Sequence, residues 1–435
     1  MSTASRAKKE KADNAIAAAA PATVPPNVQV YDDGTNTFFW RAHTVTALVL
    51  IMSGLVYVAL WDTPLDTMYN MRRGAVACVV IFVLIGVINM PDGPFVRPHP
   101  VVWRVALCVM ILYILSLIFA LFQTVDDTRQ FLALYDPELG KPLPERTYCD
   151  DCRIYAPDHP EGPFYNLLEK FDVFVLCHFF GWYVKALIIR DPWILNILSV
   201  AFELAEYTLD CQLPNFGECW WDHWILDFII CNGLGIYLGV KTCEYLSMKK
   251  YAWTGVWNTP TIKGKIKRVV SQFTPYSWTS YQWGYTENFK KFLFMCFIIV
   301  CWIVQDLNTF YLKAIYWIPP NHSLNLYREV IFAFTGACAM KEMYIFLMSS
   351  DPYHPIGRYP WLIFAVLSCE VLLEIKHGWH ILSIPIHTEW AIFWLVAAAL
   401  FTVWVVWRFT VPLRDMPVVG RYVRKMEHKV AAKTN

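Results

Sequence analysis

Charge is what this sequence has least of. Only 17% of its 435 residues are charged, against about a quarter in a typical soluble domain, while 56% are hydrophobic and 16% aromatic. The net charge of +1 and the lack of a basic, aromatic surface segment argue against a nucleic-acid partner. Neither a Walker loop nor a Rossmann glycine fingerprint occurs, so the sequence implies no nucleotide.

A cleavable signal peptide is not expected either, because the first 30 residues are polar and rich in Ala and Pro. We predict a disordered cytosolic tail over residues 1–38, a membrane catalytic domain over 39–411 and a basic cytosolic tail over 412–435. Within the membrane domain, residues 124–170 form a lumenal loop and residues 247–288 a cytosolic one.

Long apolar runs are what the sequence does have. Several reach the roughly 20 residues that cross a bilayer, which predicts an all-α, multispanning integral membrane protein with about ten transmembrane helices. The predicted spans are 41–60, 73–90, 100–123, 171–190, 193–209, 223–246, 289–312, 326–348, 359–376 and 388–410. Arg190, Asp191 and Pro192 separate the fourth from the fifth, where proline suits a tight turn or a new first helical turn.

Orientation follows from Lys and Arg in the short loops. Residues 247–268 and the C-terminal tail are basic, which predicts that both termini are cytosolic, whereas residues 210–221 hold no Lys or Arg. Arg72 and Arg73 disagree, because they begin the second span on the predicted lumenal side. Asn321, in Asn321-His322-Ser323, is a candidate lumenal N-glycosylation acceptor.

Cysteines also fall in the predicted lumenal loops. Cys149 with Cys152, and Cys211 with Cys219, would lie where disulfides are permitted, and whether they pair stays open.

The stretch from Phe202 to Gly239 organises the rest of the chain. Each ionisable group inside an apolar span costs about 2.5–3.5 kcal/mol on insertion scales. Five carboxylates fall within 25 positions here: Glu203, Glu206, Glu218, Asp222 and Asp227. Pairing with Lys185 or Arg190 is the alternative, but two bases cannot neutralise five acids. A hard cation is therefore predicted, held by these carboxylates on the lumenal side.

Spacing and ligand type refine this prediction. Glu203 and Glu206 share a helix face, whereas Asp222 and Asp227 are five apart and would lie on different faces of an ideal α-helix. We therefore expect Asp222 to reach back over the helix end. Carboxylates with an amide such as that of Asn232 suit Ca²⁺ or Mg²⁺ rather than zinc, and Ca²⁺ tolerates the irregular set better. No EF-hand spacing occurs.

His178 lies in the fourth span, near the same side. A lone histidine in an apolar span is usually a hydrogen-bonded core residue, but beside a metal-carboxylate cluster it can take a proton from a hydroxyl nucleophile. Together these residues predict phosphoryl-group transfer at a lipid head group. Gly233, Gly235 and Gly239 predict close helix packing. Asp92, Gly93 and Arg97 begin like the CDP-alcohol phosphotransferase signature, but its later glycine and aspartates are missing, so we reject that class.

Several motifs then resemble those of the base-exchange phosphatidylserine synthases, over residues from about 31 to 410. They are Asp33-Gly34-Thr35-Asn36-Thr37-Phe38-Phe39-Trp40-Arg41, Gly93-Pro94-Phe95-Val96-Arg97-Pro98-His99-Pro100, Cys177-His178-Phe179-Phe180-Gly181-Trp182, Leu213-Pro214-Asn215-Phe216-Gly217-Glu218-Cys219-Trp220-Trp221-Asp222 and Gln272-Phe273-Thr274-Pro275. The first motif, with Leu143-Pro144-Glu145-Arg146, is closest to the type-two branch, which uses phosphatidylethanolamine.

The resemblance implies a Ca²⁺-dependent enzyme of the endoplasmic-reticulum membrane that exchanges a phospholipid head group for L-serine. The mitochondria-associated part of that membrane stays open as a location, as does a homodimer. The family's essential positions match His178, Asn215 and Asn232, here assigned as catalytic, and the five carboxylates. The family's site for inhibition by its product, phosphatidylserine, matches Arg97, Arg268 and Gln272. An interfacial anchor for lipid phosphate is the alternative for Arg97.

Other readings remain open at this point. Phosphatidylcholine, the donor of the type-one branch, is the alternative donor. Either serine displaces the head group directly, or His178 forms a covalent phosphatidyl-enzyme. The rival class is an ion-coupled transporter, which predicts inverted repeats with intramembrane acids in both halves, and no second acidic cluster follows residue 250. A further alternative is a lipid-binding protein or scramblase that catalyses no reaction.

Overall fold

A computed structural model describes residues 28–29, 42–61, 66–143, 149, 151–351 and 353–410. These residues are helical apart from loops and two short strands, β1 (Val28–Gln29) and β2 (Tyr251–Ala252), which pair in parallel. The all-α prediction is confirmed. The C-terminal tail, the N-terminal tail outside β1, and the motif residues at 33–41 and 144–146 lie outside the described residues.

All ten predicted spans coincide with helices. These are α2 (Ala42–Trp61), α3 (Thr67–Asn89), α4 (Pro100–Leu121), α7 (Val173–Ile189), α8 (Pro192–Leu209), η3 with α9 (Asp222–Gly233 and Leu234–Met248), α11 (Phe289–Tyr316), α12 (Ser323–Met348), α13 (Arg358–His377) and α15 (Thr388–Thr410). Six are long and apolar enough to cross a membrane: α3, α4, η3 with α9, α11, α12 and α15. The chain is thus a multispanning membrane protein, and crossing by α2, α7, α8 and α13 stays a prediction.

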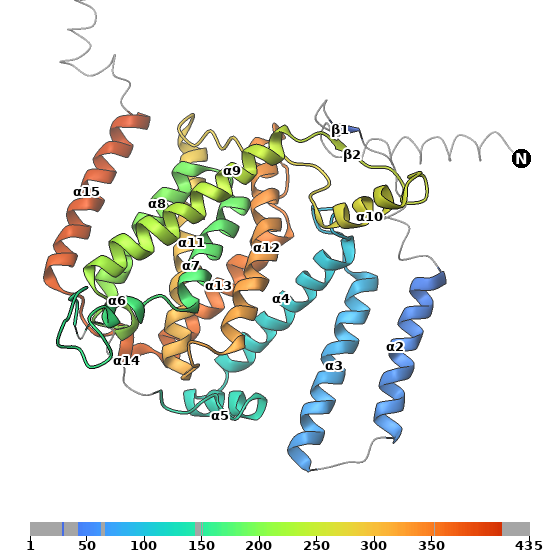
Figure 1. The fold of residues 1–435 in the computed structure, drawn as a ribbon, viewed down its shortest axis with the longest axis horizontal. Helices are drawn as coiled ribbons and strands as arrows, with labels where there is room; N and C mark the ends of the chain where they lie inside the picture. The colour runs from blue at the N-terminus through green and yellow to red at the C-terminus, as the bar shows by residue number, and fades with distance from the viewer. Residues whose placement is uncertain are drawn as a thin grey trace, which may run out of the picture.

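Shorter helices lie at the two ends of this bundle. The elements α5 (Val125–Tyr135), α6 (Tyr165–Leu168) and α14 (Trp379–Leu382) lie at one end, here called the α6 end (Figure 1). The helix α10 (Ile262–Val270), followed by η4 (Ser271–Phe273), lies with the paired strands at the opposite end, the α10 end. Loops that the sequence assigns to one side of the membrane therefore gather at one end. Which end faces the lumen stays a prediction.

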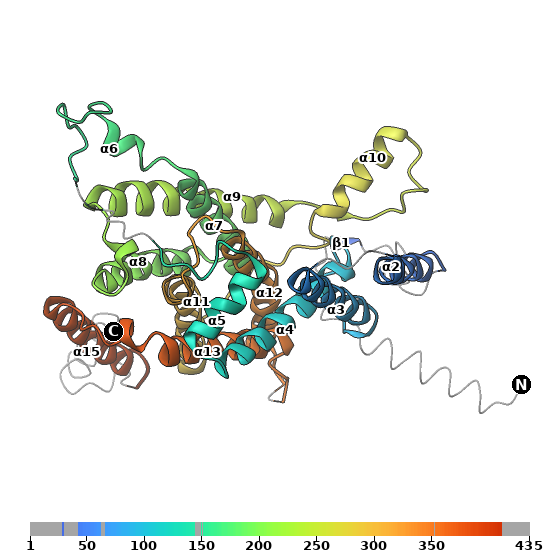
Figure 2. The ribbon, with the colours of Figure 1, turned by 90° about the horizontal axis from the view of Figure 1, so that it is seen from below.

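The core is built from the middle of the bundle. Seen from below, α11, α12 and α13 lie centrally, whereas α2 and α15 lie at opposite margins (Figure 2). Fully buried side chains include Ile315 of α11 and Val366 of α13, together with Leu195 of the neighbouring α8. Large apolar side chains on the marginal helices are exposed, as Leu50 and Leu395 are, which suits helices that face lipid.

Small residues set the distance between α7 and α9. A Cβ atom on Gly239 would lie 2.4 Å from the Cβ of Ala186, and one on Gly235 would lie 2.6 Å from the carbonyl oxygen of Phe179. Only hydrogen fits at these positions, so the predicted packing role is confirmed for both glycines.

The turn between α7 and α8 forms as its sequence predicts. Arg190 ends α7 in the left-handed region, with a φ of 59°. The Asp191 side chain then accepts hydrogen bonds from the first backbone amides of α8, and Pro192 occupies the first helical turn. Arg190 stacks over the Trp278 ring at 3.7 Å, so its charge is held at the α10 end and away from the carboxylates.

The second half of the chain carries a buried ion pair. Arg328 of α12 donates from Nε and Nη2 to the two carboxylate oxygens of Glu370 of α13, at 2.9 and 2.8 Å. Asn308 of α11 donates to the same carboxylate at 2.9 Å. Because Arg328 neutralises the buried Glu370 carboxylate, and hydrogen bonds satisfy both of its oxygens, this network joins helices without a cation at Glu370.

Candidate metal and catalytic site

The helix that carries most of the site has unusually wide turns. Over Asp222–Gly233 it is a π-helix, with hydrogen bonds from residue i to i+5, before it continues as α9. Residues five apart therefore come to lie about one turn above each other. Asp222, Asp227 and Asn232 are spaced in this way and form one row. The expectation that Asp222 must reach back over the helix end is replaced by this local change of helix type.

Three carboxylates meet at the start of this helix. Glu218 comes from the preceding loop and Asp222 and Asp227 from η3, and one oxygen of each lies within 4.8 Å of the others. Lys170, just after α6, places Nζ 2.9 Å from Asp222 Oδ2. The lysine neutralises one of three negative charges and leaves two, which a divalent cation would balance.

The pKa of the Glu218 carboxyl is affected by the same neighbouring negative charges. Burial and the neighbouring Asp227 and Asp222 carboxylates raise the pKa of Glu218 to about 8. Without a cation, this group therefore holds its proton near neutral pH. Three hard oxygen donors in this arrangement fit Ca²⁺ or Mg²⁺ and lack the sulfur or nitrogen donors that zinc prefers.

His178 lies against this group. It projects from the second turn of α7, and its Nδ1 lies 3.0 Å from Asp227 Oδ1. If Nδ1 carries the proton and donates it to Asp227, Nε2 is left as an acceptor on a half-buried ring. A carboxylate that fixes the tautomer in this way prepares the opposite nitrogen to take a proton.

Glu203 and Glu206 form a second group, with His223. The His223 Nδ1 lies 3.4 Å from Glu203 Oε2 and 3.4 Å from Glu206 Oε2, and its Nε2 lies 3.3 Å from the carbonyl oxygen of Phe216. Both ring nitrogens face acceptors, so His223 is best satisfied as an imidazolium that pairs with the two carboxylates. Asn232, on the same helix as Asp222 and Asp227, donates to Glu203 Oε1 at 2.8 Å.

The five predicted ligands therefore meet at one end of α7, α8 and η3 but fall into two sets. Glu218, Asp222 and Asp227 form the acidic set, and Glu203 and Glu206 already have a cationic neighbour. Lys185 pairs instead with Asp306 at 2.6 Å, so it does not offset these acids. Asn215 lies in η2 (Pro214–Phe216), half-buried and next to the Phe216 carbonyl that His223 contacts.

Comparison with known proteins now adds the family. Residues 98–378 match the family model described as phosphatidyl serine synthase. The chain belongs to the phosphatidylserine synthase family. Phosphatidylserine synthase 2 of Danio rerio is 49% identical over 405 residues, which cover 93% of this chain and 89% of the relative. Phosphatidylserine synthase 2 of Homo sapiens is 51% identical over 389 residues, which cover 89% and 80%.

These relatives confirm the resemblance seen in the motifs, including its type-two branch, and the assignment as an enzyme, a serine phosphatidyltransferase. A plant relative has a different printed name. CDP-diacylglycerol–serine O-phosphatidyltransferase 2 of Oryza sativa is 38% identical over 370 residues, which cover 84% of this chain and 87% of that relative. The printed name of this plant relative states a donor lipid, CDP-diacylglycerol, whereas the name phosphatidylserine synthase 2 states none.

The predicted regulatory residues also come together, at the α10 end. Arg97 is 3% exposed, and its guanidinium lies 4.5 Å from the Trp253 ring. The Arg268 guanidinium lies 5.0 Å from the same ring. Arg268 donates to Gln272 Oε1 at 3.1 Å, and Gln272 Nε2 donates to the carbonyl oxygen of Pro98 at 2.7 Å. This group, here called the arginine cluster, lies at the opposite end of the bundle from η3 (Figure 1).

Sequence reasoning missed three parts of the site. Lys170 stands 52 positions before Asp222, in a segment without periodicity that could reveal the pair. His223 is next to Asp222 in sequence but was not assigned a role. The disulfide joins Cys152 to Cys219, 67 positions apart, so Cys211 does not pair with Cys219, and Cys149 does not pair with Cys152.

Proposed function

We propose that this protein replaces the ethanolamine head group of phosphatidylethanolamine with L-serine in a Ca²⁺-dependent reaction at the lumenal leaflet of the endoplasmic-reticulum membrane. The observation that carries the proposal is the acidic set of Glu218, Asp222 and Asp227 with His178 hydrogen-bonded to Asp227. Basic loops at the α10 end support its cytosolic placement, which leaves the site at the lumenal side.

Each residue then has a chemical task. Glu218, Asp222 and Asp227 would hold the cation, which when bound supplies positive charge to the phosphodiester oxygens. His178 Nε2 takes the proton of the serine hydroxyl while Asp227 holds the ring in place. The serine oxygen bonds to phosphorus, the bond to the ethanolamine oxygen breaks, and the His178 imidazolium returns the proton to that oxygen. One phosphodiester replaces another, so no high-energy donor is required.

The deciding experiment offers three donors to the purified protein in detergent with labelled L-serine. Phosphatidylethanolamine, phosphatidylcholine and CDP-diacylglycerol are supplied separately, each with Ca²⁺ or with a chelator. We expect labelled phosphatidylserine from phosphatidylethanolamine, only with Ca²⁺ and with release of ethanolamine. Asp227→Asn is expected to abolish it, whereas Glu389→Gln, an exposed carboxylate on α15, leaves it unchanged. Product from CDP-diacylglycerol alone contradicts base exchange.

Two alternatives have their own outcomes. A phosphatidyl-enzyme on His178 predicts retention of configuration at phosphorus, whereas direct displacement predicts inversion. An ion-coupled transporter predicts no labelled lipid with any donor but Ca²⁺-dependent serine uptake into vesicles. Among the described residues, the part of the chain after residue 250 holds no three-carboxylate group like the acidic set, which favours the enzyme.

We further infer that the arginine cluster binds the product, phosphatidylserine, and inhibits the enzyme from the cytosolic side. Its support is the convergence of Arg97 and Arg268 on Trp253, with Gln272 hydrogen-bonded to Arg268. Arg97→Lys keeps the charge but loses the guanidinium fork, so we expect activity that persists when phosphatidylserine is added. Arg104→Lys, on α4 and paired with Asp92, is the control. Unchanged inhibition of the Arg97 variant would leave Arg97 as a lipid anchor.

A further inference from the structure

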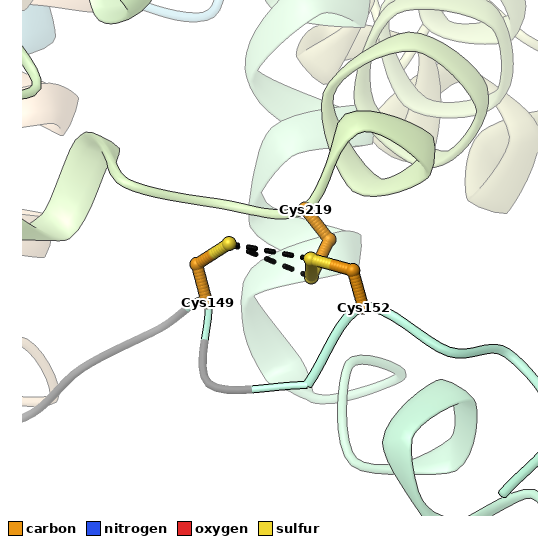
Figure 3. Close-up of side chains that lie close together, drawn as sticks. All are labelled: Cys149, Cys152 and Cys219. Atoms are coloured by element: carbon orange, nitrogen blue, oxygen red, sulfur yellow. Dashed lines mark hydrogen bonds between the residues drawn. A yellow bond between two sulfur atoms is a disulfide. The ribbon is translucent and has the colours of Figure 1, made fainter.

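Three cysteine sulfurs meet in Figure 3, and one of them belongs to Cys219, which directly follows Glu218 of the acidic set. Cys152 and Cys219 form a disulfide, and the free, exposed Cys149 places its sulfur 3.2 Å from Cys152 Sγ and 3.9 Å from Cys219 Sγ. Cys219 itself is 2% exposed. A thiol in contact with both sulfurs of a disulfide is the arrangement from which thiol–disulfide exchange begins.

We propose that Cys149, Cys152 and Cys219 form a thiol–disulfide exchange site. The Cys149 thiol loses its proton to solvent, and its thiolate attacks Cys152 Sγ. A Cys149–Cys152 bond forms, the Cys152–Cys219 bond breaks, and Cys219 leaves as a thiolate that takes a proton from solvent. One disulfide replaces another, so the step needs neither an oxidant nor a reductant.

The geometry decides which sulfur is attacked. Cys149 lies nearer to Cys152, and attack there closes a Cys-x-x-Cys pair within one short segment. Attack requires approach along the axis of the disulfide, where the two distances would differ by one S–S bond, about 2 Å. They differ by far less, so Cys149 lies beside the bond and must swing onto its axis. Its exposure leaves space for that movement.

The exchange would change what holds the acidic set in place. Cys219 follows Glu218 directly and precedes Asp222 by three positions, so its disulfide fastens this loop to the segment after Cys149. The Trp221 indole donates to the carbonyl oxygen of Cys152 at 3.1 Å across the same contact. After exchange, only such non-covalent contacts remain between the two segments. We therefore expect weaker cation binding in the exchanged form, a consequence that rests on the proposed function.

Disulfide mapping tests the exchange without any activity measurement. The full chain in detergent, without reductant, is incubated at pH 7 and pH 8.5, quenched with acid, alkylated at low pH and mapped by mass spectrometry. We expect both Cys152–Cys219 and Cys149–Cys152 peptides, with faster interconversion at pH 8.5 because the thiolate is the nucleophile. In Cys149→Ser, we expect Cys152–Cys219 to be the one disulfide found among these cysteines. Cys211→Ser, which lies outside the three, is expected to behave as wild type.

A second variant tests the proposal if almost all of the wild-type protein is found with the same one of the two disulfides. In Cys219→Ser, the proposal predicts that Cys149 and Cys152 pair. If this variant does not fold, wild type is first reduced, so that Cys152 is a thiol, and a small disulfide is then added. The Cys152 thiolate is expected to attack Cys149 in the resulting mixed disulfide, which forms the Cys149–Cys152 bond and releases the small thiol. Free Cys149 and Cys152 in Cys219→Ser, or a mixed disulfide that never resolves, overturns the proposal. A protein that exchanges but makes no phosphatidylserine refutes the proposed function alone.

Discussion

At the scale of single residues, His178 and Asp227 form the most informative contact. Their 3.0 Å hydrogen bond connects the candidate base to the acidic set, so a change at either residue has a distinct effect. Asp227 has two tasks, holding a cation and holding the imidazole ring. His178 has only the proton transfer.

His178→Gln is therefore expected to lower the initial rate of serine incorporation by about 10²–10⁴-fold, the usual contribution of a positioned general base. Ca²⁺ affinity is expected to stay within a few-fold, because glutamine can still donate to Asp227. Initial rates and radioactive Ca²⁺ binding measure the two quantities. His380→Gln, an exposed histidine on α14, serves as control. Full activity of the His178 variant removes it from the chemistry.

Glu218 predicts how cation binding depends on pH. Burial and the nearby Asp227 and Asp222 carboxylates raise its pKa to about 8, so below that pH a proton competes with the metal. We expect Ca²⁺ affinity to rise from pH 6.5 to 8, by up to about tenfold per unit for one competing proton, and to level off above pH 8. Calorimetric titration across this range measures it. Glu218→Gln should remove the slope, and a slope unchanged in that variant contradicts the assignment.

At the scale of elements, the contact between α7 and α9 positions His178 relative to η3. Gly239→Ala places a Cβ 2.4 Å from that of Ala186 and 3.0 Å from the carbonyl oxygen of Tyr183. Overpacking of this kind costs about 1–3 kcal/mol, so we expect a lower Tm in detergent together with reduced activity. Gly181→Ala on α7 meets nothing within 4 Å and is the matched control. An equal Tm for both variants would mean that α9 moves to accommodate the added methyl group without loss of stability.

Hydropathy predicted the ten apolar helices, because each is encoded by a continuous run of side chains. The wide turns of η3 escaped prediction, since the local sequence of Asp222–Gly233 satisfies an α-helical pattern equally well. The helix α10 was also missed. It is short, with exposed Ile262, Ile266 and Val270 on one face and the buried Arg268 on the other. A search for runs of about 20 apolar residues does not detect such a helix.

At the scale of the whole molecule, the acidic set and the arginine cluster lie at opposite ends of the bundle. Asn321 belongs to the α6 end, because the neighbouring His322 lies 3.4 Å from Asp136 at the end of α5. Asn321 is itself exposed. If the α6 end faces the lumen, it is accessible to the glycosylation machinery there.

We therefore expect a glycosidase-sensitive form of the protein that Asn321→Gln and Ser323→Ala both remove. Trp257→Asn creates an acceptor with Asn258 and Thr259 at the α10 end, where Trp257 is 87% exposed. That variant is expected to gain no glycan. Electrophoresis of microsomal protein before and after glycosidase treatment measures both. A glycan at position 257 in place of 321 would reverse the orientation.

The site could be predicted from sequence only where its residues are close in the chain or within known motifs. Glu203, Glu206, Glu218, Asp222 and Asp227 were found because acids are rare in apolar segments. The partners that divide them into two sets were not found, since Lys170 and His223 are ordinary in their local context. The Cys152–Cys219 bond depends on tertiary proximity across 67 positions, which no local pattern encodes.

Because η3 has wide turns, the alignment of its site residues depends on the number of residues between them more than on which apolar residues those are. Asp222, Asp227 and Asn232 stay aligned only while each pair is separated by four residues and the turns stay wide. Deletion of Ile225 would leave the two aspartates four apart, adjacent on an ordinary α-helix, but Asn232 would leave the row unless a second residue were removed beyond Asp227. Within this segment, insertions and deletions should therefore be tolerated only in pairs, while many apolar substitutions are accepted.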